Sequence, residues 1–187
     1  MANPVDLTTV ADVKAYDGSI QGNSADTLLE RLITAASTFA ETYCGRNFHA
    51  ADFEEVYEGT GTYRLMLHNY PVISVSGVSV NGLAWASTTL GTQPGFQFDK
   101  YGLYATGGYA FPRAVRNVIV NYRAGYEVIP FDLAQAVIEL VLLKFRRRDK
   151  LDIQARMIAQ ETISYTSGDM NKSTRSVFDQ YRMVAPV

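Results

Sequence analysis

The spacing of apolar residues divides the chain into helical segments near its two ends and a strand-rich segment between them. Along residues 28–43 apolar positions recur every three or four residues, which predicts a long amphipathic helix that ends at Gly45. Residues 50–123 alternate with a period of two, which predicts strands. Within them, Asn81-Gly82 predicts a tight turn, and Gly59–Thr62 predicts a turn that joins two paired strands.

Residues 116–148 carry the pattern around which the rest of the fold is expected to be organised. A strand is predicted at residues 118–122, followed by a turn and a helix. The helix is expected to begin at Asp132, with Gln135 completing a capping box, and to end in the three arginines 146–148.

This predicted helix is apolar around most of its circumference. We expect such a helix to be covered on more than one side, in a small protein by another copy of the chain. For the arginines at its end, a solvated helix terminus and a DNA-facing patch stay open as alternatives to a contact between subunits. The predicted subunit interface consists of Val137, Leu140, Lys144, Arg146, Arg147 and Arg148.

The composition is that of a globular protein. Hydrophobic residues make up 47% and charged residues 19% of the 187 positions. No apolar run approaches the roughly 20 residues that span a bilayer, so no membrane contact is expected. The net charge of −2 conceals an asymmetry, because residues 1–100 carry 5 Lys and Arg against 11 Asp and Glu, whereas residues 101–187 carry 12 against 8. Opposite charges on two parts of a molecule favour head-to-tail docking.

Few residues are candidates for catalysis or metal binding. His49 and His68 have no second histidine or cysteine at the spacing of metal ligands. Cys44 with His49 is the best candidate for a nucleophile and its base, although a small apolar group that closes the helix against the sheet is the simpler interpretation. Glu54 and Glu55 are neighbours in a predicted strand, so their side chains point to opposite faces and cannot share a proton. We therefore expect no catalytic residue, no metal site and no cofactor.

Several short motifs follow one another in the order found in a known protein family. They are Tyr43-Cys44-Gly45-Arg46-Asn47-Phe48, Tyr70-Pro71-Val72-Ile73-Ser74-Val75, Val80-Asn81-Gly82, residues 118–126, and Pro130-Phe131-Asp132-Leu133 before the arginine-ended helix. In this order they resemble the head-tail connector (adaptor) proteins of long-tailed bacteriophages, over about residues 5–185. The chain departs from that family in a long aromatic segment at residues 83–112.

The resemblance implies a structural virion protein, not an enzyme, located in the neck between head and tail and made in the cytoplasm of the bacterial host. It implies a homo-oligomeric ring, commonly of twelve subunits, that binds the portal protein and a stopper or tail-completion protein. DNA would pass through the ring without sequence-specific binding. In that family the C-terminal segment reaches toward the portal, which assigns portal contact here to Ser164, Tyr165, Phe178, Tyr181 and Arg182.

Pattern and resemblance together predict an α+β fold that is mostly helical. We expect a bundle of about four helices with an antiparallel sheet inserted between the second and third. The chain is expected to be one connector domain, residues 1–187, with a β-rich portion at 50–125 and a C-terminal arm at 160–187 that orders on binding. The alternative function is a soluble carbohydrate- or protein-binding module that uses the aromatic β-rich region.

Overall fold

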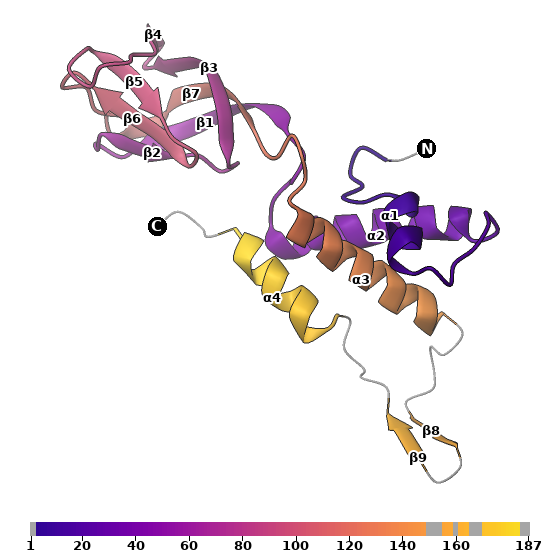
Figure 1. The fold of residues 1–187 in the computed structure, drawn as a ribbon. Coiled ribbons are helices and arrows are strands. Elements are labelled where there is room, and N and C mark those ends of the chain that lie inside the picture. Colours follow the sequence, from indigo (N-terminus) through magenta and orange to yellow (C-terminus); the bar gives the residue numbers. More distant parts are fainter. Residues whose placement is uncertain (1–2, 149–154, 159–160, 165–169, 184–187) are drawn as a thin grey trace. The chain divides into compact units, whose positions relative to one another are not determined.

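The computed structural model describes residues 3–148, 155–158, 161–164 and 170–183, which form two compact units (Figure 1). We call them the helical unit, with the chain up to Arg46 and from Ile129 to Met183, and the β unit, Asn47–Val128. Helix and strand are almost equally represented, so the fold is α+β as predicted, and the expectation of a mostly helical protein is wrong. Among the described residues no helix is both long and apolar enough to cross a membrane.

The described part of the helical unit contains four helices. They are α1 (Val10–Tyr16), α2 (Asp26–Cys44), α3 (Phe131–Arg147) and α4 (Lys172–Tyr181). Gly45, at φ 70°, ends α2 in the left-handed conformation, as predicted. Asn171 caps α4, because its side chain accepts a hydrogen bond from the Thr174 amide at 2.6 Å. This helix lies inside the segment that was expected to be a free arm.

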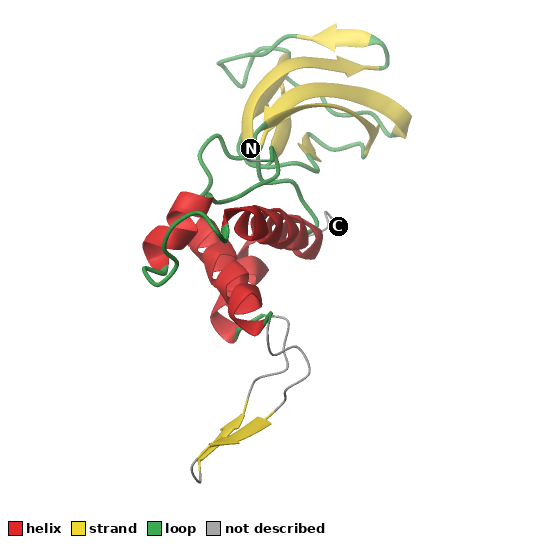
Figure 2. Cartoon of the chain, turned by 90° about the vertical axis from the view of Figure 1, so that its right-hand side faces the viewer, coloured by secondary structure: helices red, strands yellow, loops and turns green. Residues whose placement is uncertain are grey.

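Helix α3 is covered by the other helices of its own chain. Helices α1, α2 and α4 all pack against it (Figure 2). The chain itself therefore covers the apolar circumference that the sequence analysis assigned to another copy. The residues buried on α3 are Leu133, Ala136, Val137, Ile138, Leu140, Val141 and Leu142.

The start of α3 differs from the predicted capping box. Pro130 occupies the N-cap position in an extended conformation, and no side chain caps the helix. Proline is compatible with this position because its φ is fixed, and the N-cap lies two positions before the expected cap at Asp132. Asp132 accepts a hydrogen bond from the Leu133 amide at 2.9 Å instead of capping with Gln135, so that prediction is wrong.

The β unit consists of two antiparallel sheets packed face to face. Its strands are β1 (Ala51–Gly59), β2 (Arg64–Met66), β3 (Val72–Val80), β4 (Leu83–Trp85), β5 (Gly95–Phe98), β6 (Gly102–Thr106) and β7 (Ala114–Ala124). One sheet has the order β1-β7-β3-β4 and the other β2-β6-β5. Apolar side chains from both sheets, among them Leu65, Leu103 and Val118, form one core between them. The aromatic segment, residues 83–112, supplies most of the smaller sheet and of its connections. Residues of the helical unit form a further antiparallel pair, β8 (Ala155–Ile158) and β9 (Glu161–Ser164).

Two predictions about the strands have opposite outcomes. The turn at Asn81-Gly82 is confirmed between β3 and β4, with both residues at positive φ as a tight hairpin turn requires. The pairing across Gly59–Thr62 is wrong, because β1 pairs with β7 and β2 pairs with β6. β1 pairs with β7 over a long register, from Ala51 opposite Ala124 to Tyr57 opposite Val118. This pairing places the apolar faces of two long strands together, whereas β2 is too short to cover the apolar face of β1.

Replacing Phe178 by Ala is expected to lower the free energy of unfolding of the helical unit by about 3–5 kcal/mol. The ring is fully buried where α4 packs on α2 and α3, and its centroid lies 6.0 Å from that of Tyr43. Urea denaturation followed by circular dichroism measures the change. The exposed Gln180, replaced by Ala, serves as the control and should shift stability by no more than about 0.5 kcal/mol. Equal stability of the two variants would contradict the packing of α4.

Candidate interaction surfaces

The apolar residues predicted for a subunit interface lie inside the helical unit. Val137 is 0% exposed and Leu140 is 1% exposed. Their side chains have no surface left for a partner, so a contact between copies at α3 must use other side chains. The cationic end of the helix is the part of the predicted set that reaches the surface.

That cationic end is already engaged with its own chain. Arg146 donates a hydrogen bond to Asp17 at 2.9 Å, Lys144 Nζ lies 5.4 Å from the Phe39 ring centroid, and the Arg148 guanidinium lies 4.0 Å from that of Phe145. The Arg146 side chain is 68% exposed, so the ion pair contributes no more than about 1 kcal/mol. These contacts hold the arginines in place at the surface.

Asp17 joins two parts of the helical unit. Its carboxylate accepts hydrogen bonds from the hydroxyl of Ser19, at 2.6 Å, and from Arg146. These hydrogen bonds, that from Ser19 first, hold the pKa of the Asp17 carboxyl below its usual range. The carboxylate therefore stays ionised at neutral pH and fixes the end of α3 against the turn after α1.

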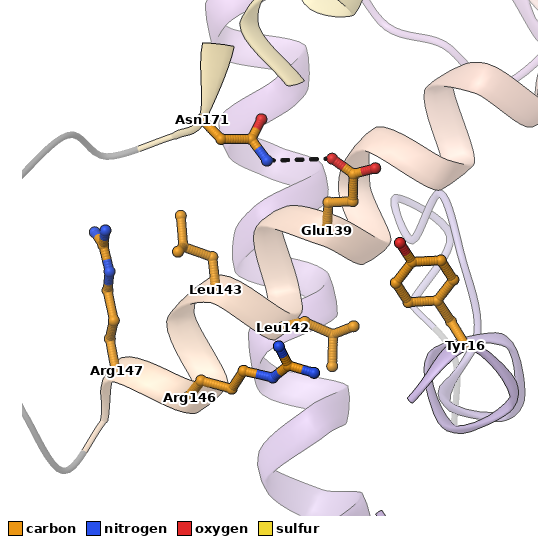
Figure 3. Close-up of a pocket in the computed structure, with 7 residues that line it drawn as sticks. All are labelled: Tyr16, Glu139, Leu142, Leu143, Arg146, Arg147 and Asn171. Carbon is orange, nitrogen blue, oxygen red and sulfur yellow. Dashed lines mark hydrogen bonds between the residues drawn. The ribbon is translucent and has the colours of Figure 1, made fainter. Parts of the chain in front are cut away.

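A groove of about 510 Å³ runs along the exposed side of α3 (Figure 3). Leu142 and Leu143 give it an apolar lining, and Arg146 and Arg147 extend beside it. Glu139 accepts a hydrogen bond at 3.2 Å from Asn171, the residue that caps α4. Tyr16 also lines the groove; neither it nor Glu139 was recognised from sequence, because they reach this helix face only through tertiary packing.

Three of the residues predicted to contact a portal lie in or directly after α4. Phe178 is buried, whereas Tyr181 donates hydrogen bonds to Asp132 at 2.8 and 2.9 Å and the Arg182 guanidinium lies 5.9 Å from the Tyr43 ring centroid. These contacts fasten the end of α4 to α2 and α3. Ser164 is the last residue of β9, and Tyr165 lies outside the described residues.

The candidate nucleophile is a packing residue. Cys44 is 0% exposed, and its thiol donates a hydrogen bond to the Phe178 carbonyl oxygen at 3.4 Å. Burial raises the pKa of this thiol to about 11, so it is protonated at neutral pH and a poor nucleophile. It packs where the end of α2 meets α4 within the helical unit. Among the described residues no cluster of three or more His, Cys, Asp or Glu side chains could hold a metal ion.

A buried polar network in the β unit was missed by the sequence analysis. Tyr57 and Tyr122 both donate hydrogen bonds to Glu55 Oε2, the latter at 2.6 Å, and Asn69 Nδ2 donates to Oε1 at 3.0 Å. The amides of His68 and Asn69 in turn donate to the two tyrosine hydroxyls at 2.9 and 3.2 Å. The network ties the segment after β2 to the four-stranded sheet. The signal in the sequence was Glu55, two residues before Tyr57 and therefore on the same, inward face of the strand. A carboxylate on that face requires a hydrogen-bond donor.

Comparison with known proteins identifies a family. The family model described as head completion protein matches residues 6–184. No curated protein compared with the chain matches it in sequence.

Solved structures of gene transfer agent (GTA) particles contain chains of the same fold. A chain in the neck of the empty particle, computed with C6 symmetry, is 18% identical with a TM-score of 0.61, and the match covers 100% of this chain and 95% of that one. A chain in the neck of the native particle, computed with C12 symmetry, is 15% identical with a TM-score of 0.59, covering 100% and 94%. A chain in the virion of the native particle is 15% identical with a TM-score of 0.59, covering 100% and 95%. At these identities the likeness establishes the shared fold.

The tyrosine network predicts a loss of stability in alkali. Burial first, and the bond to Glu55 second, raise the pKa of Tyr122 to about 12, and the pKa of Tyr57 also lies above its usual value. A tyrosine whose pKa is raised by folding contributes stability that is complete below about pH 10, its unfolded value, and that is lost as the pH rises through the folded pKa. Urea denaturation at about pH 8 and about pH 11 should show this loss in the wild type. The loss should be smaller in Tyr122→Phe and unchanged in the control Tyr109→Phe, an exposed tyrosine. An equal loss in all three proteins would rule out the network as the cause.

Proposed function

The chain belongs to the head completion protein family, and on this basis we propose that it is a structural protein of the neck of a tailed phage or phage-like particle. The match over residues 6–184 is the observation that carries the proposal, since it includes both the helical unit and the β unit. The fold shared with chains in GTA particle necks supports the same location. Its role is non-enzymatic, and its chemistry is that of surfaces that fit other proteins.

In the proposed assembly, copies of the chain form a closed ring of about twelve around the path of the DNA. The C12 symmetry used for a GTA neck supports this number. A ring of identical subunits needs two different, complementary surfaces on each copy. The DNA passes through the ring, which contacts it without reading its sequence.

The ring lies between a portal protein and a stopper or tail-completion protein. We propose that the C-terminal segment binds the portal protein. The contact residues are Ser164, Tyr165, Tyr181 and Arg182. Phe178 does not contact the portal itself, because its ring is buried. The ring anchors α4 and so fixes the positions of Tyr181 and Arg182.

A binding module built on the aromatic region receives less support. Phe96 and Phe111 are 2% and 0% exposed, and the Trp85 ring stacks on that of Phe111 at 5.3 Å between centroids. Much of the aromatic surface that a carbohydrate would need is therefore used in the core of the β unit.

Inactivating the gene for this chain is expected to give heads that fill with DNA but carry no tails. The reason is that, without the ring, the tail has no surface on the filled head to which it can bind. Electron microscopy of the particles from an infected culture measures the tailed fraction, and wild-type chain supplied from a plasmid should restore it. A normal yield of tailed particles without the chain would refute the proposed function.

Changing Arg146, Arg147 and Arg148 together to Ser is expected to weaken ring assembly at low salt and to reduce its dependence on salt. Exposed charges that bridge subunits act within a Debye length of about 10 Å at 0.1 M salt, so the wild-type ring should weaken as salt is added. Size-exclusion chromatography with light scattering at several salt concentrations measures both effects. Arg146→Ser alone separates the loss of the bond to Asp17 from the loss of all three charges. If the triple variant assembles like wild type at every salt concentration, the arginines are a solvated helix end.

A further inference from the structure

The outer face of the four-stranded sheet carries a row of carboxylates. Exposed and covered side chains alternate along β1, so every second residue points away from the core. On the neighbouring β7 the residues opposite these positions point the same way. We call this surface the acidic face, made by Asp52, Glu54, Val56, Glu58, Ile119, Asn121 and Arg123.

The acidic face combines negative charge with a small apolar centre. Arg123 donates to Asp52 at 3.3 Å, whereas Glu54 lies opposite an uncharged amide. Val56 and Ile119 lie directly opposite each other and are 40% and 39% exposed. Three carboxylates against one guanidinium leave the face negative, around two apolar side chains that water now covers.

The outer face of the three-stranded sheet is aromatic and carries an arginine. Arg64, Tyr104 and Gln97 lie opposite one another across β2, β6 and β5. The Arg64 guanidinium lies 5.4 Å from the Tyr104 ring centroid, and the 64% exposed Tyr63 stacks on the same ring at 6.5 Å. Asp99 accepts a hydrogen bond from the Tyr104 hydroxyl at 2.8 Å, which fixes the ring. We call this surface the aromatic face, made by Tyr63, Arg64, Gln97 and Tyr104.

The two faces belong to different layers of the same unit. The core of the β unit lies between the sheets, so their outer faces are directed away from each other (Figure 1). Glu58 and Arg64 do line one groove, of about 510 Å³, beside β1 and β2, so the strands meet at that edge. Glu54 does not line this groove, so a change at Glu54 alters the acidic face without altering the groove.

We propose that the acidic face of one copy binds the aromatic face of the next, head to tail, and that this contact links the subunits of the ring. That the chain forms a ring rests on the proposed function. That these two faces form the contact rests on their charge and surface chemistry. A guanidinium held over a tyrosine meets carboxylates, and two tyrosines cover the exposed Val56 and Ile119. Tyr and Arg, together with Trp, are enriched among the residues that contribute most to binding at protein interfaces. Because the two surfaces are different, and Glu54 does not share the groove that Arg64 lines, each copy keeps one surface free for a further copy until the ring closes.

The test reverses one charge on each face in the full-length protein. Glu54→Lys and Arg64→Glu should each raise the concentration needed for assembly about tenfold or more, since each places like charges together at every contact. Combining both changes in one chain restores an opposite pair, and assembly should return to within about threefold of wild type. Sedimentation velocity over a range of concentrations measures the oligomers, with circular dichroism confirming that each variant is folded.

A mixture of the two single variants provides a second measurement. The altered acidic face of Glu54→Lys fits the altered aromatic face of Arg64→Glu, and the remaining faces are wild type, so the mixture should assemble where neither variant does alone. The mixture tests the rescue even if the double variant fails to fold. The matched controls are Glu127→Lys and Arg113→Glu, the same charge changes at exposed residues outside both faces, which should assemble like wild type.

Normal assembly of either single variant, or the absence of rescue both in the double variant and in the mixture, would overturn the proposed contact. A wild-type protein that stays monomeric at its highest attainable concentration, alone and with its portal, would also overturn it. If the charge-reversed variants regain binding to a charge-reversed partner of a different kind, and not to a second copy of this chain, the two faces bind that partner. This result would also refute the proposal. The tailless phenotype of gene inactivation does not depend on these faces, so the contact can fail while the proposed function stands.

Discussion

Helix α3 has apolar side chains around most of its circumference, and the helical unit depends on covering them. The chain covers the helix with α1, α2 and α4, which come from both sides of the β unit in the sequence. This requirement brings the chain back from Val128 to the helices it left at Arg46. It also explains why α4 is fastened by the buried ring of Phe178, although the residues before it are polar.

Once α3 is covered internally, its functional meaning changes. Most of its apolar residues hold the chain together, and its charged end and the groove beside it are open to partners. The β unit supplies surfaces of another kind, because a two-layer sheet structure has two outer faces directed away from each other. In the proposed ring the helices maintain the shape of each subunit and add the charged end of α3 to the contacts, and the sheets supply the main link from one subunit to the next.

Local signals in the sequence predicted local structure well. Gly45 ends α2 because glycine tolerates positive φ, and Asn81-Gly82 turns the chain because asparagine and glycine both adopt positive φ. Pairing over long distances was not predictable: β1 had a nearby candidate in β2, yet it pairs with β7, whose register matches its apolar face. The interface residues Val137 and Leu140 were chosen because periodicity reports that a side chain is covered but not by which chain. The family was identified from an ordered set of motifs, which no single residue could have provided.

The central claim is that this protein forms a ring in the neck of a particle and acts through its surfaces. A cryo-EM reconstruction of the neck of the particle that encodes the chain tests this most directly. We expect a closed ring of copies around the DNA path, with Glu54 of each copy next to Arg64 of its neighbour. A neck reconstruction in which no density fits this chain, while tails are attached, would contradict it.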